Sequence, residues 1–362
     1  MKKLLLILLC LPMIGFGQLT YVPDDNFEAY LEANGMGNGN SNDDYVNNGN
    51  INTVTTLDVS NQNISDLTGI EDFAALAELY FSNNQVTSID LSANLSLAEL
   101  WCEDNQLTSL DASANTVLGY LECSNNQLTS LNVSNNLWLK NLFCDYNQLT
   151  SLNLLSLPLL EGLSCSFNQL SVLDLSENWD LDFIRCDSNQ LTSLDVSEKP
   201  LIYSLWCEFN QITTLDLSQN LNLEILRCSS NQLTSLNVSD NTDLIQLHCN
   251  NNQLNSLDIR NGNNVNISTN SLATDFSNNP NLYCINVDDA SWSTTNWTVA
   301  NGNIDQQHYF SNNCSTTAIE EHTTNKELLK VTDLLGRETK QTNQPLFYIY
   351  DDGTVEKKIV IE

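Results

Sequence analysis

Cysteine is the residue type in this sequence whose spacing most directly suggests chemistry. Eight of the eleven cysteines follow one 21-residue period: Cys102, Cys123, Cys144, Cys165, Cys186, Cys207, Cys228 and Cys249. Such a column could bind metal ions, form disulfides between neighbouring repeats in an exported protein, or bury free thiols as small apolar side chains.

The residues around each cysteine favour one of these three outcomes. A metal site needs paired cysteines, or cysteine with histidine, at tetrahedral spacing, and no such companion follows the repeat. Disulfides between adjacent parallel strands would have to span about 4.8 Å, whereas bonded cysteines have Cβ atoms about 3.5–4.5 Å apart. We therefore favour buried free thiols and keep metal binding and consecutive disulfides as alternatives.

Other columns repeat with the same period. A leucine or isoleucine lies two residues before each cysteine and an asparagine three residues after it, as in Leu121, Cys123 and Asn126. Because alternate residues of a strand face opposite sides, we expect the aliphatic residue and the cysteine to point inward together. The asparagine can bond buried backbone groups in the following turn, where an unsatisfied group costs about 1–3 kcal/mol.

The repeat unit LxxLxCxxNQLTSLDVSxNxx has the period and spacing of a leucine-rich repeat. A second pattern, Leu131-x-Val133, follows Leu121-x-Cys123 after ten residues, so each unit can form two short strands. We expect a mainly β solenoid with parallel strands on a concave side and on a convex side.

Degenerate coils extend the array to about twelve over residues 54–287, with an apolar residue in the cysteine place: Val59, Phe81, Ile267 and Val287. Asn270 and Leu272 follow Ile267 as they would in a regular coil.

The first coil needs a cap because terminal repeats expose their core. In residues 18–53, the run Asp25-Asn26-Phe27-Glu28 resembles a capping box with Asp25 in the Ser/Thr place, which predicts a helix. We expect Phe27, Tyr30 and Leu31 on one face of this helix, with a stop at Asn34-Gly35. The Gly-, Asn- and Asp-rich residues 35–50 then form a flexible loop or, as an alternative, a calcium loop, although they lack the EF-hand order.

The last coil is expected to carry a cap over residues 288–319, which contain Trp292, Trp297 and Phe310. Cys284 and Cys314 do not follow the 21-residue period, and we predict that they form a disulfide that pins this cap.

Residues 1–17 have the pattern of a secretory signal peptide: Lys2 and Lys3, an apolar run from residue 4 to 16, and small residues before Gln18. A membrane anchor would need about 20 apolar residues, and a lipoprotein site at Cys10 would need a small residue in place of Leu9. We expect cleavage after Gly17, secretion, and no transmembrane segment.

The positions that the repeat leaves free carry the candidate binding site. Residues one before and one after each cysteine are expected to face solvent on the concave side, and many are aromatic, basic or acidic. Such residues form binding hot spots, although exposed aromatics can also follow β-propensity alone. With residues from the position three before, the candidate ligand-binding set is Tyr80, Trp101, Glu103, Tyr120, Phe143, Asp145, Arg185, Asp187, Trp206, Glu208, Arg227 and His248.

Composition excludes several functions. With a net charge of −32, the chain lacks the clustered basic residues that phosphate contacts need, so we expect no nucleic-acid partner. No metalloprotease, nucleophile-elbow, P-loop or dinucleotide motif is present, and none of the three histidines sits in a motif. We predict a non-catalytic protein without a cofactor that recognises an extracellular protein or polysaccharide. A structural surface-layer spacer is the alternative, followed by an unrecognised hydrolase.

Two resemblances add to this interpretation. The unit at residues 121–136 resembles the cysteine-containing repeats of internalin-type bacterial surface proteins, which implies an adhesin that binds through its concave face. Residues 320–362 resemble the C-terminal sorting domain of type IX secretion substrates, through Asp333-Leu334-Leu335-Gly336-Arg337 and the final strand with Lys357-Lys358. This second resemblance implies export by the type IX machinery and a place at the outer cell surface. Asp352-Gly353 in the same segment predicts a hairpin turn.

Overall fold

The structure is a computed structural model that describes residues 18–314, 328–332, 337–339, 345–350 and 355–359. The chain divides into two compact units, residues 1–313 and 314–362, which are described separately. The expected signal peptide, including Cys10, lies outside the described residues.

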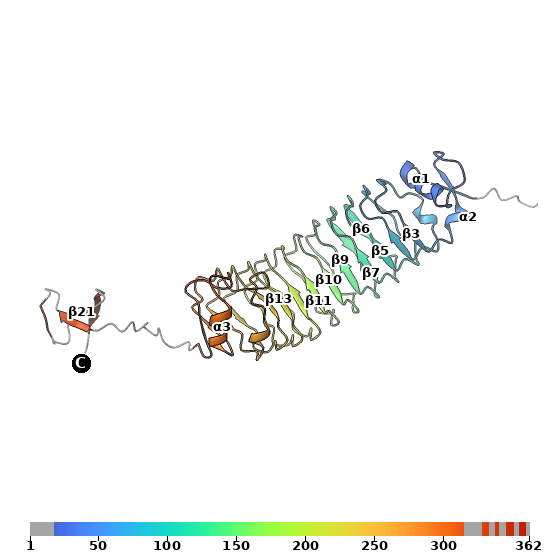
Figure 1. The fold of residues 1–362 in the computed structure, drawn as a ribbon. Helices are drawn as coiled ribbons and strands as arrows, with labels where there is room; N and C mark the ends of the chain where they lie inside the picture. Colours follow the sequence, from blue (N-terminus) through green and yellow to red (C-terminus); the bar gives the residue numbers. More distant parts are fainter. Residues whose placement is uncertain (1–17, 315–327, 333–336, 340–344, 351–354, 360–362) are drawn as a thin grey trace, which may run out of the picture. The chain divides into compact units, whose positions relative to one another are not determined.

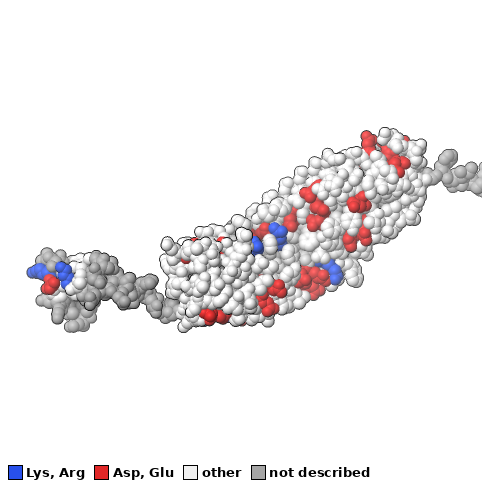
Figure 2. Space-filling model, viewed as in Figure 1, with Lys and Arg blue, Asp and Glu red and all other residues white. Residues whose placement is uncertain are grey.

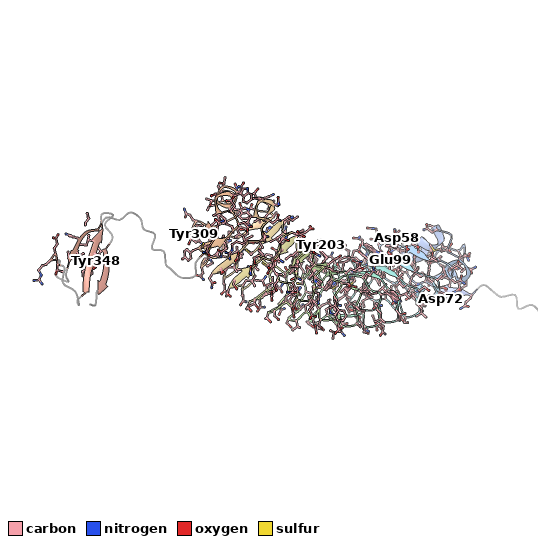
Figure 3. All side chains as sticks on the ribbon, turned by 90° about the horizontal axis from the view of Figure 1, so that it is seen from below. Asp58, Asp72, Glu99, Tyr203, Tyr309 and Tyr348 are labelled. Atoms are coloured by element: carbon pink, nitrogen blue, oxygen red, sulfur yellow. The ribbon has the colours of Figure 1, made fainter. Side chains whose placement is uncertain are left out.

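An eleven-stranded parallel sheet runs along the first unit and forms its main sheet (Figure 1). Its strands are two or three residues long and pair in chain order: β3 (Thr56–Asp58), β4 (Glu78–Tyr80), β5 (Glu99–Trp101), β7 (Tyr120–Glu122), β9 (Asn141–Phe143), β10 (Gly162–Ser164), β11 (Phe183–Arg185), β12 (Ser204–Trp206), β13 (Ile225–Arg227), β15 (Gln246–His248) and β17 (Thr274–Asp275). In Figure 3 this unit bends, and Glu99 and Tyr203, at or next to the main sheet, lie toward the inner side of the bend.

The core is a stack of aliphatic and cysteine side chains. The middle residue of each strand points inward, and the cysteine that follows the strand does the same, as at Leu100 and Cys102. All eight ladder cysteines are buried and free, in agreement with the favoured interpretation of the column. Some thiols lie against a carbonyl of the next coil, as Cys102 Sγ does at 3.3 Å from Glu122 O.

The asparagine column bonds neighbouring coils together. Asn126 Nδ2 donates to Cys102 O at 2.9 Å and to Cys123 O at 3.2 Å, while its Oδ1 accepts from Leu107 N at 2.9 Å. The same pattern recurs from Asn84 to Asn279. These carbonyl and amide groups lie inside the turn, so the asparagine replaces the water that would otherwise satisfy them.

The opposite face of the first unit carries the second set of strands in two groups. Strands β6 (Ser109–Asp111) and β8 (Ser130–Asn132) pair in parallel. Near the end of the solenoid lie β14 (Ser235–Asn237), β16 (Ser256–Asp258), β18 (Cys284–Asn286) and β19 (Tyr309–Ser311), also parallel. The predicted two-sided arrangement is thus confirmed, although the described coils between these groups contain no assigned strand on this face.

The N-terminal cap contains α1 (Asp25–Ala33), α2 (Asn48–Ile51) and the pair β1 (Leu19–Tyr21) and β2 (Tyr45–Asn47), while the 3-10 turn η1 (Ile70–Asp72) lies in the first coil, between β3 and β4. Phe27 and Leu31 are buried as predicted. The predicted cap residue is wrong by one position, because Asp24 rather than Asp25 caps α1 and accepts from Asn26 N and Phe27 N, both at 3.0 Å.

Asp24 also fixes the position of the N-terminal cap on the first coil. Its second oxygen accepts from Ser65 N and Ser65 Oγ, both at 2.8 Å, and so ties the helix to the first coil. Burial alone would raise the pKa of Asp24, but the bonds from Ser65, Phe27 and Asp66 outweigh it and lower the pKa.

The predicted continuation of the repeat after Cys249 is wrong. Phe276 takes the cysteine place and Asn279 the asparagine place, with Asn279 Nδ2 donating to Cys249 O at 3.1 Å. The step from Asn252 to Asn279 is longer than the regular step by six positions. The coil that holds Ile267 and the 3-10 turn η2 (Asn264–Asn266) therefore contains a short insertion.

The predicted place of Val287 is wrong as well. Ile285 and Val287 are buried at β18, which pairs with β16 on the second face, so they match the second half of a repeat. The total of about twelve coils still holds, because the chain makes one further turn to β19.

The C-terminal cap packs around Trp297, which is fully buried. Helix α3 (Ala290–Asn296) precedes it, and the rings of Phe276 and Trp292 lie 5.3 Å from its ring. Cys284 and Cys314 are both disulfide-bonded, and the other eight described cysteines are free, which confirms the predicted pair.

The second unit contains a three-stranded antiparallel sheet. Strand β21 (Pro345–Tyr350) lies between β20 (Leu328–Thr332) and β22 (Val355–Ile359). The pairing of β21 with β22 agrees with a hairpin, although its predicted turn, residues 352–353, lies outside the described residues. So do residues 333–336 of the resemblance to a sorting domain. Within the part of the chain that the structure describes, no helix has the length and apolar character to cross a bilayer.

Candidate recognition face

The outer surface of the main sheet, here called the sheet face, is built from three columns of side chains. They lie three residues before, one before and one after the cysteine column. Because the strands pair in register, residues one period apart become neighbours across strands, as Trp206 and Arg227 do. Basic side chains are few on this unit and lie among acidic ones (Figure 2).

Four aromatic rings form a continuous run along the N-terminal half of the sheet face. The ring of Trp101 stacks on Tyr80 with centroids 6.0 Å apart and on Tyr120 with centroids 4.4 Å apart. Tyr120 then meets Phe143 edge to face at 5.6 Å. The stacked neighbours therefore cover much of the Trp101 ring.

Carboxylates surround this aromatic run. Tyr80 Oη donates to Glu99 Oε2 at 3.3 Å. Burial, followed by the charges of Glu122, Glu103 and Glu99, raises the pKa of Tyr120 to about 12. Burial also raises the pKa of Glu122. This half of the face is thus acidic and partly desolvated.

A coil of small residues separates the two halves of the sheet face. Strand β10 contributes Gly162 and Ser164, and a Cβ at Gly162 would come within 2.6 Å of Asn141 Oδ1. Ser164 Oγ donates to Asp145 Oδ2 at 2.7 Å, and Ser166 Oγ donates to Asp187 Oδ1 at 2.6 Å. Burial raises the pKa of Asp145, although these serines and Arg185 favour its charged form.

The C-terminal half of the sheet face centres on Trp206. The guanidinium carbons of Arg185 and Arg227 lie over its ring at 4.9 and 4.5 Å from the centroid. Trp206 Nε1 donates to Ser204 Oγ at 3.1 Å, which fixes the ring. Arg185 Nε donates to Asp187 Oδ1 at 3.1 Å.

Arg227 and His248 lie side by side on β13 and β15. Arg227 Nη1 is 4.0 Å from Glu208 Oε2, and Arg227 Nη2 is 3.4 Å from Leu272 O. Arg227 Nε and His248 Nε2 are buried and have no hydrogen-bond partner among the described residues. Burial and the charge of Arg227 lower the pKa of His248 and outweigh the backbone of Leu272, which favours the protonated ring.

The structure brings the twelve predicted site residues onto one face as two clusters. Asp187 and His248, which were expected to face solvent, are buried. Sequence reasoning missed Glu99 and Glu122, which belong to the same columns, and the partner of the Trp206 ring, Ser204. The alternation of inward and outward side chains along each strand could have identified all three.

The N-terminal loop was the candidate calcium site. Glu28 accepts from Asp43 N and Asp44 N at 3.1 and 3.3 Å, and Glu32 Oε1 accepts from Asn38 N at 2.6 Å. Gly37 passes so close to Glu32 that a Cβ there would clash. The carboxylates of α1 therefore bind loop amides, and the described residues contain no group of three or more metal-ligating side chains. Calcium binding stays an untested prediction.

Parallel strands at a 21-residue step, an aliphatic core and asparagine-bonded turns define this chain as a leucine-rich-repeat protein by fold. Its neighbours among solved structures include internalin-type proteins. The functional domain of InlJ from Listeria monocytogenes, described as including a cysteine ladder, is 32% identical with a TM-score of 0.56, over 75% of this chain and 66% of that protein. The chain thus spans slightly less than two thirds of that domain.

Two further structures have lower identity. The internalin InlF from Listeria monocytogenes is 19% identical with a TM-score of 0.46, over 82% of this chain and 96% of that one. The plant peptide hormone receptor RGFR1 is 22% identical with a TM-score of 0.50, over 60% of this chain and 40% of that one. No protein-family model matches the chain, and no curated protein matches it.

Proposed function

We propose that this chain is an exported, non-catalytic recognition protein that binds a protein partner through the sheet face. One observation carries the proposal: aromatic edges, carboxylates and guanidinium groups form two clusters on one face between β4 and β15. Tryptophan, tyrosine and arginine in such settings contribute most of the free energy of protein–protein binding.

The covered ring faces favour a protein over a polysaccharide. A sugar ring stacks on an open aromatic face, but Trp101 lies between two rings and Trp206 between two guanidinium groups. The ring edges and the mixed charges remain for a partner, and these suit side chains and backbone groups of a protein. The solved receptor RGFR1, in complex with RGF2, shares this fold.

The route to the partner is part of the proposal. Residues 1–17 as a signal peptide, and the second unit as a type IX sorting domain, would place the solenoid outside the cell. The internalin-type neighbours and the disulfide Cys284–Cys314 support an extracellular role, because disulfides persist in oxidising compartments.

Binding of the secreted protein to mixed arrays of surface proteins and glycans tests the proposal. We expect a protein ligand, and we expect the Trp101→Ala/Trp206→Ala variant to lose it. The matched control is Trp138→Ala/Trp179→Ala, which removes two exposed tryptophans outside the main-sheet strands. Thermal unfolding of both variants checks that they remain folded.

Each other outcome contradicts part of the proposal. A glycan ligand lost by the first variant would replace the protein partner with a polysaccharide. A ligand that survives in the first variant would move the site away from the sheet face. The absence of any ligand would favour a structural spacer.

A further inference from the structure

Positive charge is scarce in the first unit and is concentrated at one point of the sheet face. Residues 18–314 contain only five lysines and arginines: Lys140, Arg185, Lys199, Arg227 and Arg260. Two of these five converge on Trp206. This is a local exception in a chain whose net charge is −32.

The fold places these two arginines against one aromatic ring. Arg185, Trp206 and Arg227 are direct neighbours on three adjacent parallel strands. The two guanidinium groups therefore approach the ring of Trp206 from opposite sides, and each gains a cation–π contact that limits its rotation. His248 continues the same column on the next strand.

Arg227 has hydrogen-bond donors without close acceptors. Arg227 Nε is buried and unpartnered, and its other nitrogens make only contacts of 3.4 and 4.0 Å. The neighbouring His248 is 9% exposed, but its lowered pKa keeps the ring neutral, so it adds no positive charge to the two arginines. Arg185 makes one close hydrogen bond, from its Nε to Asp187 Oδ1 at 3.1 Å, whereas Arg260 donates to Asp258 through both its Nε, at 2.9 Å, and its Nη2, at 2.5 Å.

Buried donors without acceptors are costly unless a ligand supplies the acceptor. A planar guanidinium group fits a carboxylate through two parallel hydrogen bonds. We propose that Arg185 and Arg227 form a subsite that binds a carboxylate side chain of the protein partner. This inference rests on the proposed function and deepens it by assigning charge to one part of the partner.

The N-terminal half of the sheet face carries charge of the opposite sign. Glu99, Glu103 and Glu122 surround the aromatic run, so the partner segment over β5 and β7 is basic, whereas the segment over β11 to β15 is acidic. Five strand steps separate β7 from β13, which is about 24 Å. An extended peptide covers that distance with about seven residues.

Synthetic peptides test the subsite directly on the folded secreted protein. The probe has two lysines and two glutamates separated by seven Gly/Ser residues, and its reverse sequence allows for either chain direction. The matched probe replaces both glutamates by glutamine. We expect the glutamate probe to bind at least about tenfold more tightly than the glutamine probe, since a buried charge pair is lost.

Variants assign the effect to the cluster. Arg185→Gln/Arg227→Gln should abolish the preference for glutamate, while Arg260→Gln, which changes an arginine already paired with Asp258, should leave it intact. Arg227→Gln/Glu208→Gln preserves the local charge balance and should reduce the preference without unfolding the protein, as thermal unfolding will show.

Three results would overturn the subsite. Equal affinity for the two probes, an equal loss in the Arg260 variant, or tighter binding of an oligogalacturonate than of the peptide would each exclude a carboxylate of a protein partner here. If the natural protein ligand is lost by the Trp101 and Trp206 variant but unaffected by the arginine variants, the proposed function stands and only this subsite fails.

Discussion

The guanidinium carbon of Arg227 lies 4.5 Å from the centroid of the Trp206 ring on the neighbouring strand. The contact exists because the two strands pair in register, so that residues one period apart become neighbours. The repeat keeps its core residues constant while its outward-facing residues vary. Because the register is fixed, the residue one period away is the neighbour of each outward-facing side chain on the next strand. Under the proposed function, the sheet face is where sequence variation would determine specificity.

The asparagine column is expected to dominate stability. In Asn147→Ala, the carbonyls of Cys123 and Cys144 and the amide of Leu128 lose bonds of 2.9 to 3.2 Å. At about 1–3 kcal/mol for each buried group left unsatisfied, the free energy of unfolding should fall by about 3 kcal/mol or more. Urea unfolding measures the change. The neighbouring Gln148→Ala, an exposed site, should have little effect, and a similar loss in both variants would contradict the role of the column.

The ladder thiols are expected to be inaccessible in the native protein. Burial raises the pKa of each, as at Cys144, and the thiolate is the reactive form. Titration with a thiol reagent should therefore be very slow until the chain from residue 18 is denatured, when eight thiols should react. Two or none after denaturation without reductant would show that the ladder is oxidised.

Two aspartates should affect stability with opposite sign, and only the effect of Asp145 should change between pH 7 and pH 5. Burial raises the pKa of Asp145, so its charged form costs stability at pH 7, and this cost fades as the pH falls through the raised pKa. The Asp145→Asn variant should therefore be more stable to unfolding than the native protein at pH 7, and this difference should be smaller at pH 5.

Asp111 provides the control of opposite sign. Hydrogen bonds, chiefly from Ser113, lower the pKa of Asp111, so its charge stabilises the fold above the unfolded pKa and loses that effect as pH falls through the lowered value. Asp111→Asn should lose stability at pH 7 and retain that deficit at pH 5. Urea unfolding at both pH values distinguishes the pair, and parallel trends in the two variants would contradict the assignment.

The regular part of the fold was predictable because its determinants are local and repeated. Leu121, Cys123 and Asn126 occupy the places that the period assigns to them. Phe276 was missed because a six-residue insertion shifts the frame and a buried Thr274 replaces the expected leucine. Asp24 was missed because its second set of partners, at Ser65, is distant in sequence.

Whether the aromatic ring faces are open was harder to predict than which residues lie on the sheet face. Alternation placed Trp101 and Trp206 on the outer side of the sheet, but whether a ring face is open depends on the rotamers of its neighbours. Those neighbours turned out to be Tyr120 and Arg227, which cover the faces. Distances between side chains of successive coils are not encoded in any local pattern.

The disulfide is expected to hold the last coils in place. Cys284 and Cys314 close a loop of about 30 residues, and the chain-entropy estimate for such a loop is about 3–4 kcal/mol. The bond joins Cys284 in β18 to Cys314, which follows β19 in the sequence. Strands β18 and β19 pair with each other and are the last two strands of the second face. In Cys284→Ala/Cys314→Ala, hydrogen exchange should therefore accelerate at β18, β19 and Trp297, while β5 to β12 remain protected. Cys249→Ala is the control, because it removes a thiol of the ladder and leaves the cap closed. Exchange that accelerates equally along the whole sheet in the double variant would show that the cap does not unfold as a separate unit.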